Sequence, residues 1–226
     1  MKKLFFFILM ALATASLQAQ IKIGVIGGVT FANQKWVSNA QNYDASIATK
    51  LKFHVGANSD IPLSAAFSLQ PEFYFSYQGS SLSQNFPLLT NYNDFNIGYL
   101  KMPVCLTYMK DFDKLFWYVG AGPYAARAVH STTTFIQNNE RINAGTLRIG
   151  RSWDDQITPY DLGLKFKTGF EIKRGINMGV YYEMGLKDIN PQFVQTYNRV
   201  FGVSASYLFS ITQEDKYNRY PDYYHY

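Results

Sequence analysis

The chain of 226 residues contains a single cysteine, Cys105, and no apolar run long enough to cross a bilayer as a helix. One cysteine cannot form an internal disulfide, and the lack of a cysteine near the N-terminus argues against a lipoprotein anchor. A transmembrane helix needs about 20 predominantly apolar residues, and the apolar run at residues 4–13 is too short for that. These absences exclude a disulfide scaffold and a helical membrane protein.

The motifs of nucleotide, metal and nucleic-acid sites are also missing. Gly24, Gly27 and Gly28 lack the Gly-x-Gly-x-x-Gly spacing that a dinucleotide-binding turn requires. No spacing of His, Cys, Asp or Glu matches a zinc site, so no cofactor or metal is expected. The 21 Lys and Arg residues outnumber the 16 Asp and Glu residues, but they are dispersed along the chain, and nucleic-acid binding is not expected.

The N-terminus has the form of a secretory signal peptide. A cationic start precedes the apolar residues 4–13, and small residues follow up to Ala19. We expect residues 1–19 to be removed by cleavage after Ala19, with cleavage after Ala15 as the alternative. Residues 20–211 are then expected to form a single domain outside the cytoplasm.

What the sequence does contain is a regular alternation of apolar residues with polar or small ones. In residues 176–187, Ile, Met, Val, Tyr, Met and Leu alternate with Asn, Gly, Tyr, Glu, Gly and Lys. A period of two is typical of a strand with two different faces. The pattern recurs along the chain and predicts eight strands, at residues 21–32, 50–63, 66–79, 95–109, 115–128, 158–173, 176–187 and 198–211.

Alternation by itself fits two kinds of eight-stranded up-and-down barrel. A lipocalin has its apolar face inside, whereas an outer-membrane barrel turns that face toward lipid. Five or six large apolar residues per strand exceed the room inside eight strands, so we expect the apolar face to point outward. We therefore predict an all-β protein, an eight-stranded antiparallel up-and-down transmembrane β-barrel in the cell outer membrane. A soluble, lipocalin-like barrel is the alternative.

The connections between the predicted strands alternate in length. Long ones follow the odd-numbered strands, at residues 33–49, 80–94, 129–157 and 188–197, and the others are short. Outer-membrane barrels have long outer loops and short periplasmic turns. Both termini are therefore expected in the periplasm.

Aromatic residues and prolines lead to two further expectations. Aromatic side chains make up 17% of the sequence, and those at strand ends are expected to form girdles at the membrane interfaces. The expected girdles are Tyr108, Phe112, Phe116, Trp117, Tyr207 and Phe209 on the periplasmic side and Tyr77, Tyr99 and Tyr160 on the outer side. Pro71, Pro103 and Pro123 fall within strands, where each removes a ladder donor, and we expect β-bulges there.

Five segments carry a family resemblance. They read FSLQPEFYFS at 67–76, YLKMPV at 99–104, YVGAGPY at 118–124, GLKDIN at 185–190 and NRVF at 198–201. In this order they resemble the PorT-like family of outer-membrane β-barrel proteins, over nearly the whole mature chain. The namesake of that family is associated with export of proteins through a type IX secretion system. The resemblance therefore implies a small outer-membrane barrel and, as one possible role, an accessory component of protein secretion.

Charged residues on the small, polar face of the strands are the candidate site. Lys52 and Lys187 share this face with six residues that are expected to form a polar network in the lumen: Glu72, Lys101, Lys165, Lys167, Glu171 and Glu183. Inside so narrow a barrel such charges are expected to pair and to fill the interior. Passage of ions or solutes is the alternative.

The expected role is that of a non-enzymatic, membrane-anchored scaffold that binds partners through its outer loops and its tail. The tail, residues 212–226, contains five tyrosines and is interpreted as a periplasmic extension or as a docking peptide. A lipid-modifying or proteolytic enzyme at the outer rim is an alternative. Its candidate residues are His54 and His130, near the outer strand ends, because a general base must reach its substrate.

Three kinds of partner are expected from this reading. The barrel contacts outer-membrane lipids and lipopolysaccharide, the barrel-assembly machinery inserts it, and a secretion-system or periplasmic protein binds the tail. Basic residues near the outer rim are candidates for contact with lipopolysaccharide phosphates: Lys50, Lys52, Arg127, Arg141, Arg148 and Arg151.

Overall fold

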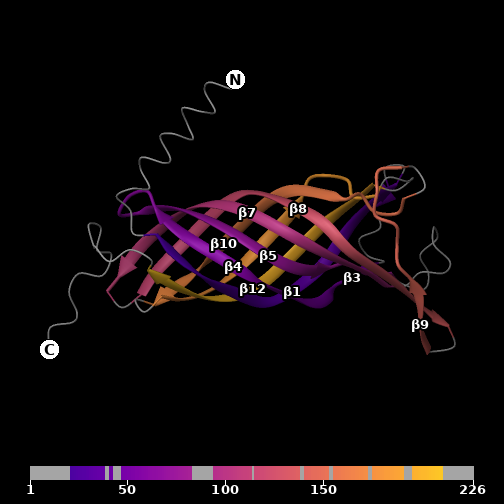
Figure 1. Cartoon of the computed structure of the whole chain (residues 1–226), viewed down its shortest axis with the longest axis horizontal. Coiled ribbons are helices and arrows are strands. Elements are labelled where there is room, and N and C mark those ends of the chain that lie inside the picture. The colour runs from indigo at the N-terminus through magenta and orange to yellow at the C-terminus, as the bar shows by residue number, and fades with distance from the viewer. Residues whose placement is uncertain are drawn as a thin grey trace, which may run out of the picture.

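The computed structural model describes residues 21–38, 41–42, 47–82, 94–113, 115–137, 140–152, 155–172, 175–190 and 195–210. Within these residues, eight long antiparallel strands form a closed up-and-down barrel (Figure 1). They are β1 (Lys22–Ser38), β4 (Lys50–Pro62), β5 (Phe67–Gln78), β7 (Asp94–Phe112), β8 (Leu115–Gln137), β10 (Tyr160–Ile172), β11 (Ile176–Gly185) and β12 (Gln195–Ser210). The predicted fold class is confirmed. The expected signal peptide and the tail at 212–226 lie outside the described residues.

The strands follow one another around the ring in chain order, and the last strand closes on the first. β1 pairs with β12 from Lys22↔Ser210 to Val37↔Gln195, and the ladder between β7 and β8 completes the circle. Closure pairs the backbone N–H and C=O groups that an open sheet edge would leave unsatisfied in hydrocarbon.

The two ends of the barrel differ in their connections. At the turn end, successive strands are joined by residues 63–66, 113–114 and 173–175. At the opposite loop end, the connections are longer, and the described residues there include four short strands. These are β2 (Gln41–Asn42), β3 (Ile47–Ala48), β6 (Ser81–Leu82) and β9 (Glu140–Gly145).

The two faces of the wall are those that the alternation predicts. On β5, Ser68, Gln70 and Glu72 are buried, whereas Phe67 and Phe73 point outward and are 44% and 55% exposed. The same division holds on the other long strands, where the exposed side chains are predominantly large and apolar. This is the arrangement of a barrel that meets lipid, and the lipocalin-like alternative is wrong.

Three strands run further than predicted at the loop end. β1 continues to Ser38 and β12 begins at Gln195, because the two strands pair with each other beyond the apolar region. β8 continues to Gln137 and pairs with β9. Residues 129–157 were predicted to be a loop and instead contain a hairpin. Alternation could not reveal this pairing, because the outward residues here are no longer apolar.

The β-bulges expected at Pro71, Pro103 and Pro123 do not form. At each proline the ladder on one side skips two residue pairs and resumes in the same register. The sheet therefore accommodates the backbone N–H that each proline lacks without the extra residue of a β-bulge. Within the described residues, the register of β7 and β8 shifts instead at Gly98/Tyr99.

Two residues of the expected aromatic girdles lie in the lumen instead. Tyr99 and Phe116 are 0% and 5% exposed, because Tyr99 shares the inward parity of Lys101 on β7 and Phe116 that of Tyr118 on β8. Tyr108, Tyr160 and Tyr207 do point outward, as expected, with 38%, 39% and 51% of their surface exposed.

Candidate functional site

The inward face of the barrel carries charged side chains on strands that lie across the lumen from each other. Around the ring, β5 and β11 are separated by three strands on either side, and β5 and β10 by two on the shorter side. A contact between the inward residues of these strands must therefore cross the interior. Strand parity places Glu72 on β5, Lys165 on β10 and Glu183 on β11 on this face.

Lys165 is at the centre of the charged cluster. Its Nζ lies 2.5 Å from Glu72 Oε2, 3.2 Å from the Tyr74 hydroxyl and 4.0 Å from Glu183 Oε1. The Tyr74 hydroxyl donates a hydrogen bond to Glu183. The ammonium also lies 4.8 Å from the centre of the Tyr74 ring and 4.4 Å from that of Tyr181, within the range of cation–π attraction. Two carboxylates and two aromatic rings thus surround one buried cation.

Two further lysines complete the cluster. Lys101 Nζ lies 2.5 Å from Glu183 Oε2 and 4.4 Å from the centre of the Tyr124 ring. Lys167 Nζ lies 2.7 Å from Glu72 Oε1, and its side chain is 11% exposed, whereas that of Lys101 is 0% exposed. We use the name central network for Glu72, Tyr74, Lys101, Lys165, Lys167 and Glu183.

Five of the six residues predicted for the lumen lie in the central network, and the sixth lies elsewhere. Glu171, near the turn end, accepts a hydrogen bond of 3.0 Å from Lys22 Nζ, and both side chains are buried. The prediction did not include Lys22, although it shares the inward parity of Gly24. It also missed Tyr74, because a tyrosine on the polar face was not counted as a lumen residue.

Lys52 and Lys187 have different positions, although both were expected to face the lumen. Lys52 Nζ donates to Asn96 Oδ1 at 2.6 Å, near the loop end. Lys187 lies on the outer surface, with its Nζ 5.7 Å from the centre of the Tyr160 ring. The expectation for Lys187 is wrong, because β11 ends at Gly185. Beyond that residue, strand alternation no longer determines whether a side chain points into the lumen or away from it.

A polar bridge crosses the lumen between the central network and the loop end. Asn198 Nδ2, on β12, donates to Asp161 Oδ2 at 2.9 Å and to the Tyr99 hydroxyl at 3.3 Å. The Tyr124 hydroxyl donates to the same Asp161 oxygen at 2.9 Å. Because β7, which carries Tyr99, and β12 lie opposite each other in the ring, this contact also spans the interior.

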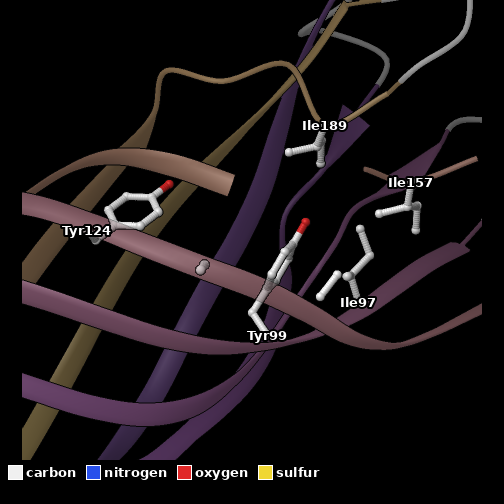
Figure 2. Packing of buried hydrophobic residues seen from close by; sticks show 7 residues of the cluster. Ile97, Tyr99, Tyr124, Ile157 and Ile189 are labelled. Carbon is white, nitrogen blue, oxygen red and sulfur yellow. The ribbon is translucent and has the colours of Figure 1, made fainter. Parts of the chain in front are cut away.

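An apolar cap covers the bridge at the loop end. Ile157 and Ile189, from the segments that precede β10 and follow β11, belong to one buried cluster with Tyr99 and Tyr124 (Figure 2). Each of these four side chains is at most 4% exposed. The Thr158 N–H donates to the Ile189 carbonyl at 2.8 Å and joins the two segments. The lumen is therefore filled by ion pairs, polar contacts and a folded-in cap.

The two histidines suggested for a rim enzyme do not come together. His54 is 2% exposed inside the lumen, with its Nδ1 3.2 Å from the Tyr181 hydroxyl. His130 is exposed on the outward face, beside Thr132 and at the register shift between β7 and β8. The expectation that His54 lies at a wet rim is wrong, because its parity on β4 turns it inward. The part of the chain that the structure describes has no group of three or more His, Cys, Asp or Glu residues arranged to hold a metal ion.

The chain belongs to the outer membrane protein β-barrel domain family, whose model matches residues 15–190. This membership agrees with the closed ring and its apolar outer face. No α-helix among the described residues is long and apolar enough to span a bilayer. No curated protein matches the chain.

Several solved structures are similar to the chain. The outer membrane protein OprG from Pseudomonas aeruginosa is 12% identical, with 84% of this chain and 96% of that chain covered and a TM-score of 0.48. The attachment invasion locus protein Ail of Yersinia pestis, solved with the heparin analogue sucrose octasulfate, is 10% identical, with 84% and 99% covered and a TM-score of 0.41. Neisserial surface protein A is 11% identical, with 84% and 97% covered and a TM-score of 0.40. At such identities these proteins do not indicate what the chain binds.

Replacing Lys165 by Met should lower the free energy of unfolding by about 3–5 kcal/mol, because Glu72 and Glu183 would keep buried charges without their shared cation. Lys167→Met makes the same chemical change at the next inward position of β10. It should cost only about 2 kcal/mol, as expected for one hydrogen bond to a charged group. Urea unfolding of the barrel in lipid vesicles, followed by tryptophan fluorescence, measures both values. Equal losses would contradict the central position of Lys165.

Proposed function

We propose that the protein is a non-enzymatic, closed barrel that anchors a partner-binding surface in the outer membrane. The observation that supports this most strongly is the filled lumen. Three sets of contacts cross the lumen: the ion pair of Lys22 and Glu171, the central network, and the hydrogen bond of Asn198 to Tyr99. Ile157 and Ile189 cover the lumen at the loop end. The charges in the lumen have the role of holding the walls together, and not that of conducting ions.

The binding surface that we propose is the hairpin of β8 and β9. A transmembrane strand needs about 9–11 residues, whereas β8 has 23. In Figure 1, β9 projects from the barrel at the end opposite the tight turns. Within the described residues, β9 pairs only with β8, so its other edge can accept an added strand of a partner.

We propose further that the loop end faces the cell exterior. Barrels of this class have short turns on the periplasmic side and long loops outside. β1 begins and β12 ends at the turn end, so both termini are periplasmic in this orientation. A periplasmic partner, and the barrel-assembly machinery during insertion, then meet the turn end and the tail at residues 212–226.

The narrower resemblance to the PorT-like family supports a second proposal, that of an accessory component of a type IX secretion system. Residues 67–76 and 118–124, which carry part of the resemblance, lie on β5 and β8 in the barrel wall. These segments are part of the wall and belong neither to the paired residues of the hairpin of β8 and β9 nor to the tail. The secretion role therefore depends on the hairpin or the tail as the docking element. The enzyme alternative has no assembled group of residues to support it in the described structure.

The full chain, reconstituted in a planar bilayer, should give no stepwise current, because the lumen is bridged at several levels. A variant in which a flexible linker replaces residues 147–157 removes one side of the cap and should remain closed, since the central network lies below it. An open porin measured in the same bilayers is the control. Steady current steps from the wild type would contradict the closed-barrel proposal.

A photo-crosslinking residue at Ile142 on β9, which is 38% exposed, should form protein adducts in growing cells, because the hairpin is the proposed binding surface. The matched control is Met178 on β11, which is 57% exposed on the lipid face and should give no protein adduct. Mass spectrometry identifies the adducts. Secretion-system components among them would favour the accessory role, and equal adducts at both positions would contradict the hairpin proposal.

A cysteine placed at Ser152, at the loop end, should react with a membrane-impermeant maleimide in intact cells when Cys105 has been replaced by Ser. The control is Ala65→Cys in the turn between β4 and β5, which should react only after the outer membrane has been permeabilised. Both positions are exposed, so the contrast reports orientation rather than burial. The reverse pattern would invert the proposed topology.

A further inference from the structure

Cations gather on the outward face of the wall at the loop end, on one side of the barrel. Arg127 on β8 lies directly across from Tyr160 on β10 in the strand register. Lys187 follows β11, and Arg199 on β12 is paired with Met184. Strand parity directs Arg127, Tyr160 and Arg199 away from the lumen. Four adjacent strands thus contribute to one patch, about 14 Å wide at the usual strand spacing.

Aromatic rings and backbone carbonyls contact three cations of the patch, Arg151, Lys187 and Arg199. Arg151 Cζ lies 5.3 Å and Lys187 Nζ 5.7 Å from the centre of the Tyr160 ring. Arg199 Nη1 donates to the carbonyl of Gly185 at 2.6 Å, and its Cζ lies 6.0 Å from the centre of the Tyr197 ring. The guanidinium of Arg199 uses only part of its five donors in these bonds.

None of the four cations forms an ion pair with a described carboxylate, in contrast to basic residues on the other side of the barrel. Lys50 Nζ lies 3.0 Å from Asp94 Oδ2, and Lys52 donates to Asn96. Those two lysines were candidates for phosphate contact, but their partners are protein side chains. The acidic residue next to Lys187, Asp188, accepts the backbone N–H groups of Asn190 and of Thr196 on β12, at 3.0 and 2.9 Å.

The patch lies at the level where the lipid-facing surface ends. Toward the middle of the barrel, the next outward residues are Leu162 on β10, which is 51% exposed, and Phe201 on β12, which is 44% exposed. Beyond the patch come Thr158 and the polar loop segments. Tyrosines and basic side chains at such a boundary meet lipid head groups, and the apolar residues next to them meet the acyl chains.

We propose that Arg127, Arg151, Lys187 and Arg199 form a binding site for the phosphate groups of an outer-leaflet glycolipid of the lipopolysaccharide type. Arginine forms bidentate hydrogen bonds with phosphate oxygens, and two arginines about 14 Å apart can hold separate phosphates of one head group. The acyl chains lie along Leu162 and Phe201. The choice of an outer-leaflet lipid depends on the orientation proposed above, whereas the phosphate chemistry does not.

The test uses the full mature chain in phosphatidylcholine nanodiscs, titrated with fluorescent lipopolysaccharide. The triple variant Arg127→Gln/Lys187→Gln/Arg199→Gln should bind about tenfold more weakly, as expected for the loss of several exposed ionic contacts. The charge-conserving variant Arg127→Lys/Arg199→Lys should bind about threefold more weakly than the wild type, because lysine keeps the charge and loses the bidentate hydrogen bonds. Lys110→Gln is the matched control. The Nζ of Lys110 also lies over an aromatic ring, 5.3 Å from the centre of the Phe112 ring, but this residue is at the turn end. This control should leave binding unchanged.

Heat-dependent mobility on gels shows that each variant is folded. Enzymatically dephosphorylated lipopolysaccharide should compete poorly with the fluorescent lipopolysaccharide. If it competed as well as intact lipopolysaccharide does, the phosphate site would be overturned. Phosphatidylglycerol that competes as well as lipopolysaccharide would overturn the assignment to a glycolipid. Equal binding by the triple variant and Lys110→Gln would overturn the patch itself. Nanodiscs offer lipid to both ends of the barrel, so a reversed orientation in the cell does not alter these results.

Discussion

An eight-stranded barrel has little more room inside than its own side chains fill, and the other features of this lumen depend on that limit. A large inward residue requires a small one beside it. A Cβ atom on Gly202 would lie 2.4 Å from Tyr181 Cζ, and one on Gly163 would lie 2.6 Å from Tyr124 Cε1. The glycines of the inward face therefore provide the space that the tyrosine rings around the central network occupy.

The same narrowness brings charges from distant strands into contact. Lys165 and Glu72 lie on strands separated by two others, yet their charged atoms are 2.5 Å apart. Removing two charges from water is costly, and their attraction compensates only when further hydrogen bonds satisfy the remaining atoms. Here Glu72 also accepts from Lys167, and Glu183 accepts from both Lys101 and Tyr74. The network thus joins opposite walls and fixes the cross-section of the barrel.

The barrel and its inward residues were predictable because lipid and lumen impose opposite requirements on alternate residues of each strand. Glu72 and Lys165 could be assigned to the lumen for this reason. The pairing of Glu171 with Lys22 could not be predicted, because contacts across the lumen depend on the stagger of the whole ring. Beyond the membrane the outer face meets water, so the alternation fades, and neither β9 nor the inward-folded Ile157 had a signal in the sequence.

A filled lumen restricts recognition to the outside of the wall and to the two ends of the barrel, and β8 connects the wall with the loop end. It passes the lipid-facing surface, reaches the cation patch at Arg127 and continues for ten residues to Gln137, about 33 Å of extended strand. If Arg127 is held at the level of the lipid phosphates, the tip of the hairpin lies well above them. Anchoring and partner binding then use different parts of one continuous strand. Because the central network joins opposite walls of the barrel, the position of the hairpin relative to the membrane follows from the fold.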